Sequence, residues 1–371
     1  WLKERKRSTK SSLLFQGGWF LYLGYELASE IEPSLNLHKD HLLPTAFAVR
    51  CTAGIIYDHL KKECIFVSEN NCEKTKSFLK NDLKKIASTS GATNIINKDL
   101  IEDMPINYIN MVSKAKKHIK EGHIYQANLS RNWNIQVAPE VTANMIYEKL
   151  CITNPAPFAG IAHWNDSSII SSSPERLIKI KEGKISTRPI AGTRRRSCDI
   201  QVDSNLSDEL FTHPKESAEH IMLVDLERND LGRVCLPGSV RVDEMMTLES
   251  YAHVHHIVSN IKGRLKKEIT PGDSIAAVFP GGTITGCPKI RCMQIINELE
   301  LSARGAYTGS FGYLNLDGSL DLNILIRTMV KHKNEVIFRA GAGIVAESAP
   351  RAELNETRAK AKGLLKVFKN V

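Results

Sequence analysis

Long apolar runs, paired cysteines and a recognisable nucleic-acid-binding module are all missing from this chain. No stretch approaches the roughly 20 apolar residues that a membrane-spanning helix needs, and the longest apolar patches are as short as residues 18–24. The eight cysteines are scattered without a Cys-x-x-Cys pair, which argues against a zinc site or a redox pair. No lysine or arginine cluster lies beside aromatic residues as in a nucleic-acid-binding module. We therefore expect no membrane and no nucleic-acid partner, and the unpatterned cysteines favour a cytoplasmic location.

The sequence also opens without an initiator methionine or a signal peptide. Residues 1–10 hold five Lys or Arg and one Glu, with no apolar core behind them. We expect the chain to begin inside a longer native protein, truncated at its start. The rest of the net charge of +9 is spread thinly over the chain, which suits an anionic small substrate.

The order of predicted elements indicates an α+β fold. Short β-branched and aromatic runs predict strands within residues 47–67, and apolar spacing predicts a helix from Ile106 to Glu121 that ends at Gly122. Strand pairs joined by short turns favour antiparallel sheet, and long helices between them exclude a doubly wound sheet. The C-terminal half is expected to contain a helix over 207–231, a strand over 250–264, a helix over 288–300, strands over 306–315, 320–331 and 335–340, a glycine-rich loop over 341–343 and a helix over 350–368.

Two pairs of carboxylates are the strongest chemical signal. Glu216 and Glu219 are three residues apart in one helical run, and Glu353 and Glu356 are three apart in another. Residues at i and i+3 share one face of a helix, so each pair directs two oxygen donors the same way. A single pair of this kind usually faces water. Four converging carboxylates would instead need a cation, and Mg²⁺ is the hard cation that suits few protein ligands and several waters.

Further polar residues follow predicted strands. Glu175 comes just after the strand at 168–172, and Tyr251–Ser259 contains three histidines, with His253 and His255 on one strand face and His256 on the other. A lone strand histidine is usually structural, but three within four residues favour acid–base work or anion binding at one of them.

These motifs, in this order, resemble those of the chorismate-utilising enzymes. The shared segments are Ser-Pro-Glu175, Pro-Ile-Ala-Gly-Thr193, the Lys215–Asp230 helix, His-His-Ile-Val-Ser259, Gly-Thr283-x-x-Gly-x-Pro-Lys289, Ile-Arg327-Thr, Gly341-Ala-Gly343 and Glu353-x-x-Glu356-Thr. The match covers roughly residues 105–371. It implies large antiparallel sheets packed in a sandwich-like core with helices outside, as in anthranilate synthase component I. We expect residues 1–104 to form the N-terminal part of that fold and residues 105–371 the chorismate-binding catalytic domain.

The resemblance also implies roles for individual residues. Glu175 would be the acid that protonates the departing 4-hydroxyl of chorismate, and His256 would lie near the reacting ring. Glu219 and Glu356 would bind Mg²⁺ directly, with Glu216 and Glu353 behind them or binding through water. The substrate-binding residues would be Ala191, Thr193, Tyr307, Arg327, Gly341, Ala342 and Gly343. In the ammonia-using branches, a separate glutamine amidotransferase subunit supplies ammonia, and none is visible in this sequence.

Two segments favour aminodeoxychorismate synthase component I, which serves 4-aminobenzoate and folate biosynthesis. These are Tyr125-Gln-Ala-Asn-Leu129 and Phe279-Pro-Gly-Gly-Thr-Ile-Thr-Gly286. Ala191 points the other way, because many members of that branch carry a lysine there that attacks the ring. Anthranilate synthase component I, which serves tryptophan biosynthesis, is the alternative. The water-using isochorismate and salicylate branches fit less well, and the intact Glu175, Glu219 and Glu356 argue against a non-catalytic binding subunit.

Overall fold

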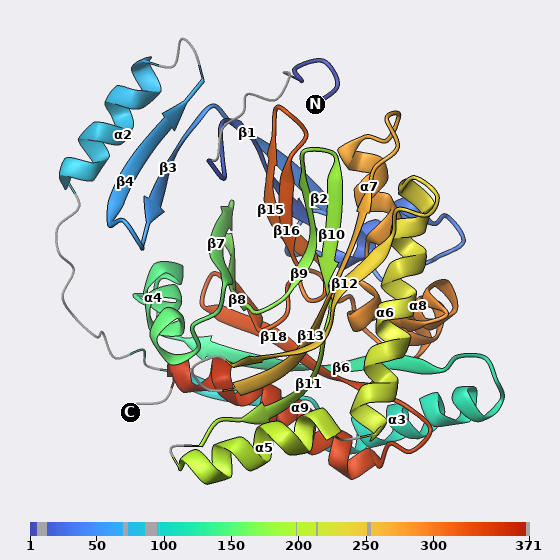
Figure 1. Cartoon of the computed structure of the whole chain (residues 1–371). Helices are drawn as coiled ribbons and strands as arrows, with labels where there is room; N and C mark the ends of the chain where they lie inside the picture. The colour runs from blue at the N-terminus through green and yellow to red at the C-terminus, as the bar shows by residue number, and fades with distance from the viewer. Residues whose placement is uncertain are drawn as a thin grey trace.

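The computed structural model describes residues 1–5, 13–69, 73–85, 95, 97–197, 199–212, 214–250 and 254–368. Within these ranges, helices surround two large sheets, and all neighbouring strands run antiparallel (Figure 1). The predicted α+β class is confirmed. No helix in the described ranges is long and apolar enough to cross a membrane.

The larger sheet has nine strands among the described residues. Its hydrogen-bonded order is β11-β13-β10-β9-β16-β15-β1-β2, and β12 pairs with β13. The bounds are β1 (Gly18–Leu23), β2 (Ala46–Cys51), β9 (Arg176–Lys181), β10 (Lys184–Arg188), β11 (Ile190–Arg195), β12 (Arg241–Ser250), β13 (Val254–Arg264), β15 (Ser310–Asn315) and β16 (Leu320–Asn323).

The second sheet has seven strands in the described part of the chain. Its hydrogen-bonded order is β14-β6-β18-β17-β8-β7, and β5 also pairs with β6. The bounds are β5 (Asn97–Glu102), β6 (Gln126–Val137), β7 (Phe158–Trp164), β8 (Ser167–Ser173), β14 (Gly286–Cys287), β17 (Thr328–His332) and β18 (Glu335–Ile344). A separate hairpin pairs β3 (Ala53–Asp58) with β4 (Glu63–Ser68).

The helices pack on the outer faces of the sheets. Helices α3 and α9 contact β6 and β18, and α6 contacts β11 and β13 (Figure 1). The α-helices are α1 (Ala28–Ile31), α2 (Glu73–Lys85), α3 (Pro105–Lys120), α4 (Ala143–Thr153), α5 (Ile200–Thr212), α6 (Pro214–Val234), α7 (Pro271–Val278), α8 (Lys289–Leu299) and α9 (Pro350–Leu365). The 3₁₀ turns are η1 (Tyr25–Leu27), η2 (Gly282–Ile284) and η3 (Lys366–Phe368).

Helix α3 illustrates how sequence periodicity determines packing. Its buried residues are Tyr108, Val112 and Ala115, which recur at helical spacing along one face. The helix ends where Gly122 adopts a φ of +75°, which glycine adopts without a steric penalty. The predicted helix over 106–121 is therefore confirmed together with its end.

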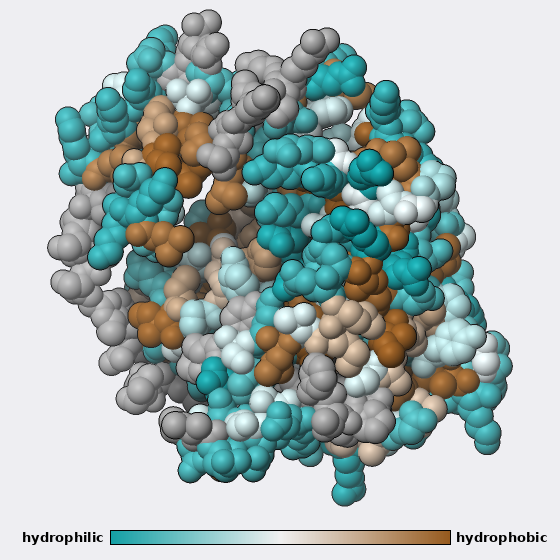
Figure 2. All heavy atoms as spheres, viewed as in Figure 1, coloured by the Kyte–Doolittle hydropathy of each residue, from teal (hydrophilic) through white to brown (hydrophobic). Residues whose placement is uncertain are grey.

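Apolar side chains fill the space between the two sheets. Tyr22 and Phe311 from the larger sheet share one buried cluster with Ile169 from the second sheet. This sandwich-like core is the arrangement expected from the sequence. Hydrophobic residues also gather outside it, over β3, β4 and α2, at the upper left of Figure 2.

Three sequence predictions need correction in the fold. The helix over 207–231 is two helices, α5 and α6, with Pro214 as the first residue of the second. Proline has no N–H to donate and disfavours helical backbone at the residue before it. The strand over 250–264 is the end of β12 followed by β13, and these two strands pair with each other. His253, between them, lies outside the described residues.

The third correction concerns the strand predicted over 320–331. The chain instead forms β16 in the larger sheet and β17 in the second sheet. The residues between them, 324–327, carry the chain from one sheet to the other. The same change of sheet occurs between β8 and β9, which are the respective neighbours of β17 and β16. Two adjacent strands therefore cross between the sheets together.

A buried charge cluster holds these parts in place. The Glu300 carboxylate accepts hydrogen bonds from Arg304 (Nη2–Oε1, 2.7 Å), from Arg339 of β18 (Nη2–Oε2, 2.8 Å) and from the Ser130 N–H of β6 (2.7 Å). Arg304 in turn donates to the Ile284 carbonyl of η2 (3.1 Å). Glu300 therefore links β6, β18 and η2 through interactions that exclude water.

We expect Glu300→Gln to lower the free energy of unfolding by about 3–5 kcal/mol, because it leaves two buried guanidinium groups without their counter-charge. Urea unfolding followed by tryptophan fluorescence would measure the loss. Glu298→Gln is the control, since Glu298 is only two residues away but largely exposed, and its ion pair with Arg291 is at 4.0 Å. Equal losses in the two variants would contradict this account.

Candidate functional site at the sheet crossovers

The Glu175 side chain lies where β8 becomes β9. The two crossing strands are bonded to each other at this point, because Ile324 N–H donates to the Glu175 carbonyl (3.0 Å) and Ser172 N–H donates to the Arg327 carbonyl (3.1 Å). Glu175 and Arg327 thus belong to neighbouring crossovers. The structure brings together a carboxyl group and a guanidinium group that are far apart in sequence.

Burial determines the chemistry of Glu175. The residue is 4% exposed, and its Oε1 accepts from the Thr283 hydroxyl (2.9 Å) and from the Ile190 N–H (3.4 Å). The pKa of the Glu175 carboxyl is raised to about 7, mainly by desolvation and also by the charge of Glu227, against the lowering effect of the hydrogen bonds and of Arg327. A carboxyl with this pKa is protonated in a large fraction of the molecules at neutral pH and can give its proton to a leaving group.

The Arg327 backbone is strained. Its φ is +51°. Thr308 has a φ of +64°, and its N–H donates to the carbonyl of Leu325 in the same crossover (2.9 Å). Left-handed backbone at a β-branched residue is unusual and concentrates at functional sites. Burial lowers the pKa of the Arg327 guanidinium. The negative charge of Glu175 raises it, so the two groups interact electrostatically.

His256 lies on β13 beside β11. It is buried, its backbone pairs with Thr193, and its Nδ1 donates to the Gly192 carbonyl (3.4 Å). The pKa of His256 is lowered to about 4, mainly by burial and also by the positive charge of Arg327. The imidazole is therefore neutral at pH 7 and suited to hydrogen bonding. The side chains of Ala191 and Thr193 lie outside the described part of the structure.

The glycine-rich segment at the end of β18 was expected to be a loop, and that expectation is wrong. Gly341–Gly343 continue the strand and pair with Asn128–Ser130 of β6. A Cβ on Gly341 would lie 2.7 Å from the buried Tyr307 hydroxyl and 2.6 Å from the Leu129 carbonyl, so only glycine fits. The strand persists because its glycines admit this close approach.

The carboxylate pair of α9 lies near this strand. Glu353 is buried, and its charge contributes to raising the pKa of Tyr108, after burial as the main cause. Glu356 is half exposed and forms an ion pair with Lys360 (2.8 Å), whose Nζ also donates to the Gly341 carbonyl (3.0 Å). The pair is thus tied to the same strand that contacts Tyr307.

The carboxylates of α6 are described only in part. Glu219 is half-buried, and the Glu216 side chain lies outside the described residues. The donor set of Glu219, Glu353 and Glu356 is all oxygen, which fits a hard cation. Among the described side chains, however, the only three potential ligand atoms within 4.8 Å of one another belong to the surface group at the end of α3, His118, Glu121 and His123.

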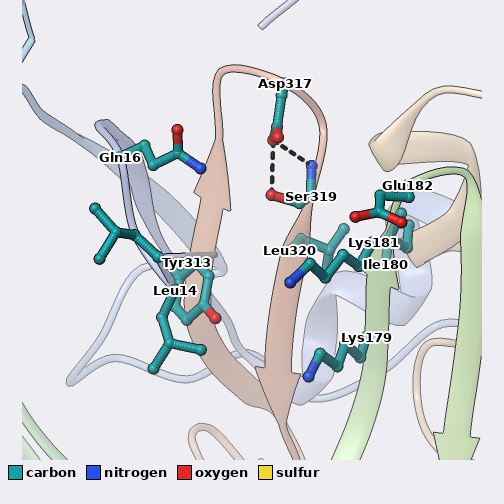
Figure 3. Close-up of a pocket in the computed structure, with 11 residues that line it drawn as sticks. Leu14, Gln16, Lys179, Ile180, Lys181, Glu182, Tyr313, Asp317, Ser319 and Leu320 are labelled. Atoms are coloured by element: carbon teal, nitrogen blue, oxygen red, sulfur yellow. Dashed lines mark hydrogen bonds between the residues drawn. The ribbon is translucent and has the colours of Figure 1, made fainter. Parts of the chain in front are cut away.

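The sequence interpretation missed one residue of this site, Glu227. It is 3% exposed on α6, and its Oε1 accepts from the Gly282 N–H (3.1 Å). Helical spacing was the available signal, because Glu227 follows the buried His220 by seven residues and Leu223 by four. A second feature, the pocket in Figure 3, contains none of the site residues. It lies at the tips of β9, β15 and β16 and is lined by residues such as Leu14, Lys179 and Tyr313.

The chain is similar to known proteins both in sequence and in structure. A model of the chorismate binding enzyme family matches residues 2–366. The "anthranilate synthase component I-like protein" of Synechocystis is 44% identical over 95% of this chain and 73% of its own length. Aminodeoxychorismate synthase component 1 of Bacillus subtilis is 38% identical over 97% of this chain and 79% of its own length.

A solved structure agrees with these similarities. The crystal structure of anthranilate synthase component I from Streptococcus pneumoniae TIGR4 superposes with a TM-score of 0.88 at 33% identity. The match covers 97% of this chain and 83% of that one. Since the family match starts at residue 2, the likeness extends well N-terminal of residue 105. The division of the chain at residue 104 stays a prediction.

Proposed function

Because the chain belongs to the chorismate-binding enzyme family and so utilises chorismate, we propose that it aminates chorismate at C4, as aminodeoxychorismate synthase component I. The observation that carries the acid-assisted step of this proposal is the buried Glu175 beside Thr283 and Arg327, whose pKa of about 7 leaves a large fraction of it protonated at neutral pH. In this reaction ammonia adds at C4, and the 4-hydroxyl takes a proton and leaves as water. Hydroxide is a poor leaving group, so a positioned acid is required.

The neighbours of Glu175 have matching roles in the proposal. Arg327 binds a carboxylate of the dianionic substrate through its planar guanidinium. Tyr307 and the backbone of Gly341–Gly343 contact the same substrate, and neutral His256 donates or accepts a hydrogen bond beside the ring. Ala191 and Thr193, whose backbone belongs to β11, complete the proposed set of substrate-binding residues. Each role rests on the match to the family motifs.

The choice of C4 rests on two sequence segments that prove to be structural neighbours. Tyr125–Leu129 and Phe279–Gly286 pair as β6 and β14, with Gly286 opposite Ala127. Asn128 fixes the contact, since its N–H donates to the Thr285 carbonyl (2.8 Å) and its Nδ2 donates to the Ile284 carbonyl (3.1 Å). The two segments that resemble the aminodeoxychorismate branch therefore form one unit next to Thr283, the residue that hydrogen-bonds Glu175.

Anthranilate synthase component I is the second candidate. Ala191 favours it, because alanine offers no amine to attack the ring at a position that is often lysine in the other branch. Several relatives also carry that name, among them anthranilate synthase component 1 of Bacillus subtilis at 39% identity. Under the first candidate, ammonia attacks the ring directly. In both, a glutamine amidotransferase subunit is the proposed source of ammonia.

We also propose that the cofactor is Mg²⁺, held directly by Glu219 and Glu356. Glu216 and Glu353 would support these ligands or bind through water. When bound, the cation acts as a Lewis acid on the ring carboxylate of chorismate. Lys360 would then lose its ion pair with the Glu356 carboxylate and keep its hydrogen bond to the Gly341 carbonyl.

The product decides between the two candidates. Incubation with chorismate, Mg²⁺ and an ammonium salt is expected to yield 4-amino-4-deoxychorismate, identified by mass, which an added lyase converts to 4-aminobenzoate. Anthranilate with released pyruvate would instead establish the second candidate. Isochorismate or salicylate, formed with or without ammonia, would overturn both.

We expect Glu175→Gln to reduce kcat by about 10²–10⁴-fold while chorismate binding changes little, because glutamine keeps the shape but has no proton to give. In the unmodified protein, kcat/KM is expected to fall as pH rises through about 7, where Glu175 loses its proton. Steady-state kinetics between pH 6 and pH 9 would measure both. A Gln variant within twofold of the parent would remove Glu175 from the mechanism.

Glu219→Gln and Glu356→Gln are expected to weaken Mg²⁺ activation at least tenfold without unfolding the protein, since each removes one charged ligand. Activity would be titrated against Mg²⁺ in each variant, with circular dichroism as the check on folding. Glu148→Gln, an exposed carboxylate on α4, is the control. An unchanged Mg²⁺ requirement in both variants would contradict the metal assignment.

A further inference from the structure

Glu227 is a buried carboxyl whose position in the site is unexplained by the family motifs. Its Oε1 accepts from the Gly282 N–H (3.1 Å), and the Thr187 hydroxyl also donates to the carboxyl. Its Oε2 is buried without a hydrogen-bond partner among the described residues. A buried oxygen with no partner is costly if the carboxyl is ionised, so this group tends to keep a proton.

One short turn contacts both Glu227 and Glu175. In η2, Gly282 donates its N–H to Glu227, and the next residue, Thr283, donates its hydroxyl to Glu175. The turn is pressed against α6, since a Cβ at Gly282 would lie 2.6 Å from Leu226 Cδ2 and 3.1 Å from Glu227 Oε1. The two carboxyls therefore accept hydrogen bonds from consecutive residues of one closely packed turn.

Other charged groups lie on both sides of Glu227 and Glu175. On one side, Asp230 and Lys289 form a buried ion pair, and on the other the Arg327 charge acts on Glu175. The pKa of the Glu227 carboxyl is raised to about 7, mainly by desolvation and also by the Asp230 charge, while Lys289 lowers it. Glu227 and Glu175 therefore ionise in the same pH range, so that the charge of one acts on the other.

The histidines that face α6 and its neighbours leave this balance unchanged at neutral pH. His220 is buried on α6, its Nε2 is 2.5 Å from the Ser259 hydroxyl, and burial lowers its pKa to about 4. His256 on β13 is neutral for the same reason. Arg233, whose charge lowers the pKa of Asp230, is a further cation beside these charged groups and donates to the Ala277 carbonyl of α7 (3.5 Å).

We propose that Glu227 is a positioning residue that forms a coupled carboxyl pair with Glu175, so that its charge keeps the proton of the catalytic acid in place. The role rests on the proposed function, in which Glu175 is the acid. Two carboxyls in one dry site do not ionise together, because each negative charge disfavours the second. The pair loses its protons in two steps, and the like charge of Glu227 delays the loss from Glu175 to higher pH.

Glu227→Gln keeps the acceptor for Gly282 and removes the charge. The fall of kcat/KM at alkaline pH is expected to move to lower pH by about one unit, because Glu175 no longer has a charged neighbour. The KM for chorismate at pH 6.5 should stay within twofold. Glu227→Asp retains a carboxyl and should keep the fall near its original pH. An unchanged profile in Glu227→Gln would overturn the proposal.

Asp225→Asn is the matched control. Asp225 lies on the same helix two residues away, but it is largely exposed and bonded to Arg228 (2.9 Å). Removing this carboxylate should leave the pH profile in place. A shift as large as that of Glu227→Gln would mean that any charge on α6 has this effect, which would also overturn the proposal.

A second readout does not depend on activity. Infrared titration of the unmodified protein should show two protonated buried carboxyls that ionise in separate steps, and Glu175→Gln and Glu227→Gln should each leave one that ionises in a single step. If the coupling persisted in both variants, the proposed pair would be overturned. If Glu175→Gln stays active while the infrared titration shows the coupling, the proposed function fails and the carboxyl pair stands.

Discussion

The carboxylate of Glu300 is the interaction on which the arrangement of the site depends. It lies in a dry interior between two guanidinium groups and bonds β6, β18 and the turn before β15. Arg304 extends this linkage, since it also donates to the carbonyls of Ile284 in η2 (3.1 Å) and Asn128 in β6 (2.6 Å). The position of Thr283, and hence the hydrogen bond to Glu175, follows from a charge cluster that never contacts the substrate in our proposal.

The crossovers add a second constraint. Where a strand leaves one sheet for another, its backbone must bend, and its side chains are enclosed by both sheets. Glu175 and Arg327 occupy these bends, and the positive φ of Arg327 shows that the backbone there is held away from its preferred conformations. Burial at this point shifts the pKa of an ordinary carboxyl into the neutral range. The strained backbone and the buried acid therefore have one cause, the change of sheet.

Periodic features of the sequence predicted the fold well, and long-range pairing limited the rest. The helix over 106–121 carries its own pattern of buried positions, and the strands around 47–67 are rich in β-branched and aromatic residues, so local residues suffice. The continuous apolar run over 320–331 gave no sign that β16 and β17 belong to different sheets, because strand partners decide that. Gly341–Gly343 looked like a loop because glycine usually marks one, and only the approach of β6 and Tyr307 explains the strand. Glu175 was identified through its motif, whereas Glu227 was passed over because a glutamate on a helix usually faces water.

The chemistry of the two candidate products shows which residues can distinguish them. Anthranilate has no 4-hydroxyl, and in 4-amino-4-deoxychorismate an amine has replaced it, so both reactions must expel the same group. An acid at Glu175 therefore serves either reaction, and its burial carries no information on the branch. The difference must arise where ammonia approaches the ring, which places it on the side chains around C2 and C4. Ala191 on β11 and the paired segments β6 and β14 are the parts of this chain that differ between the branches. Of these, β6 and β14 support the turn that carries Thr283, so the segment on which our proposal of amination at C4 rests is also the one that positions Glu175.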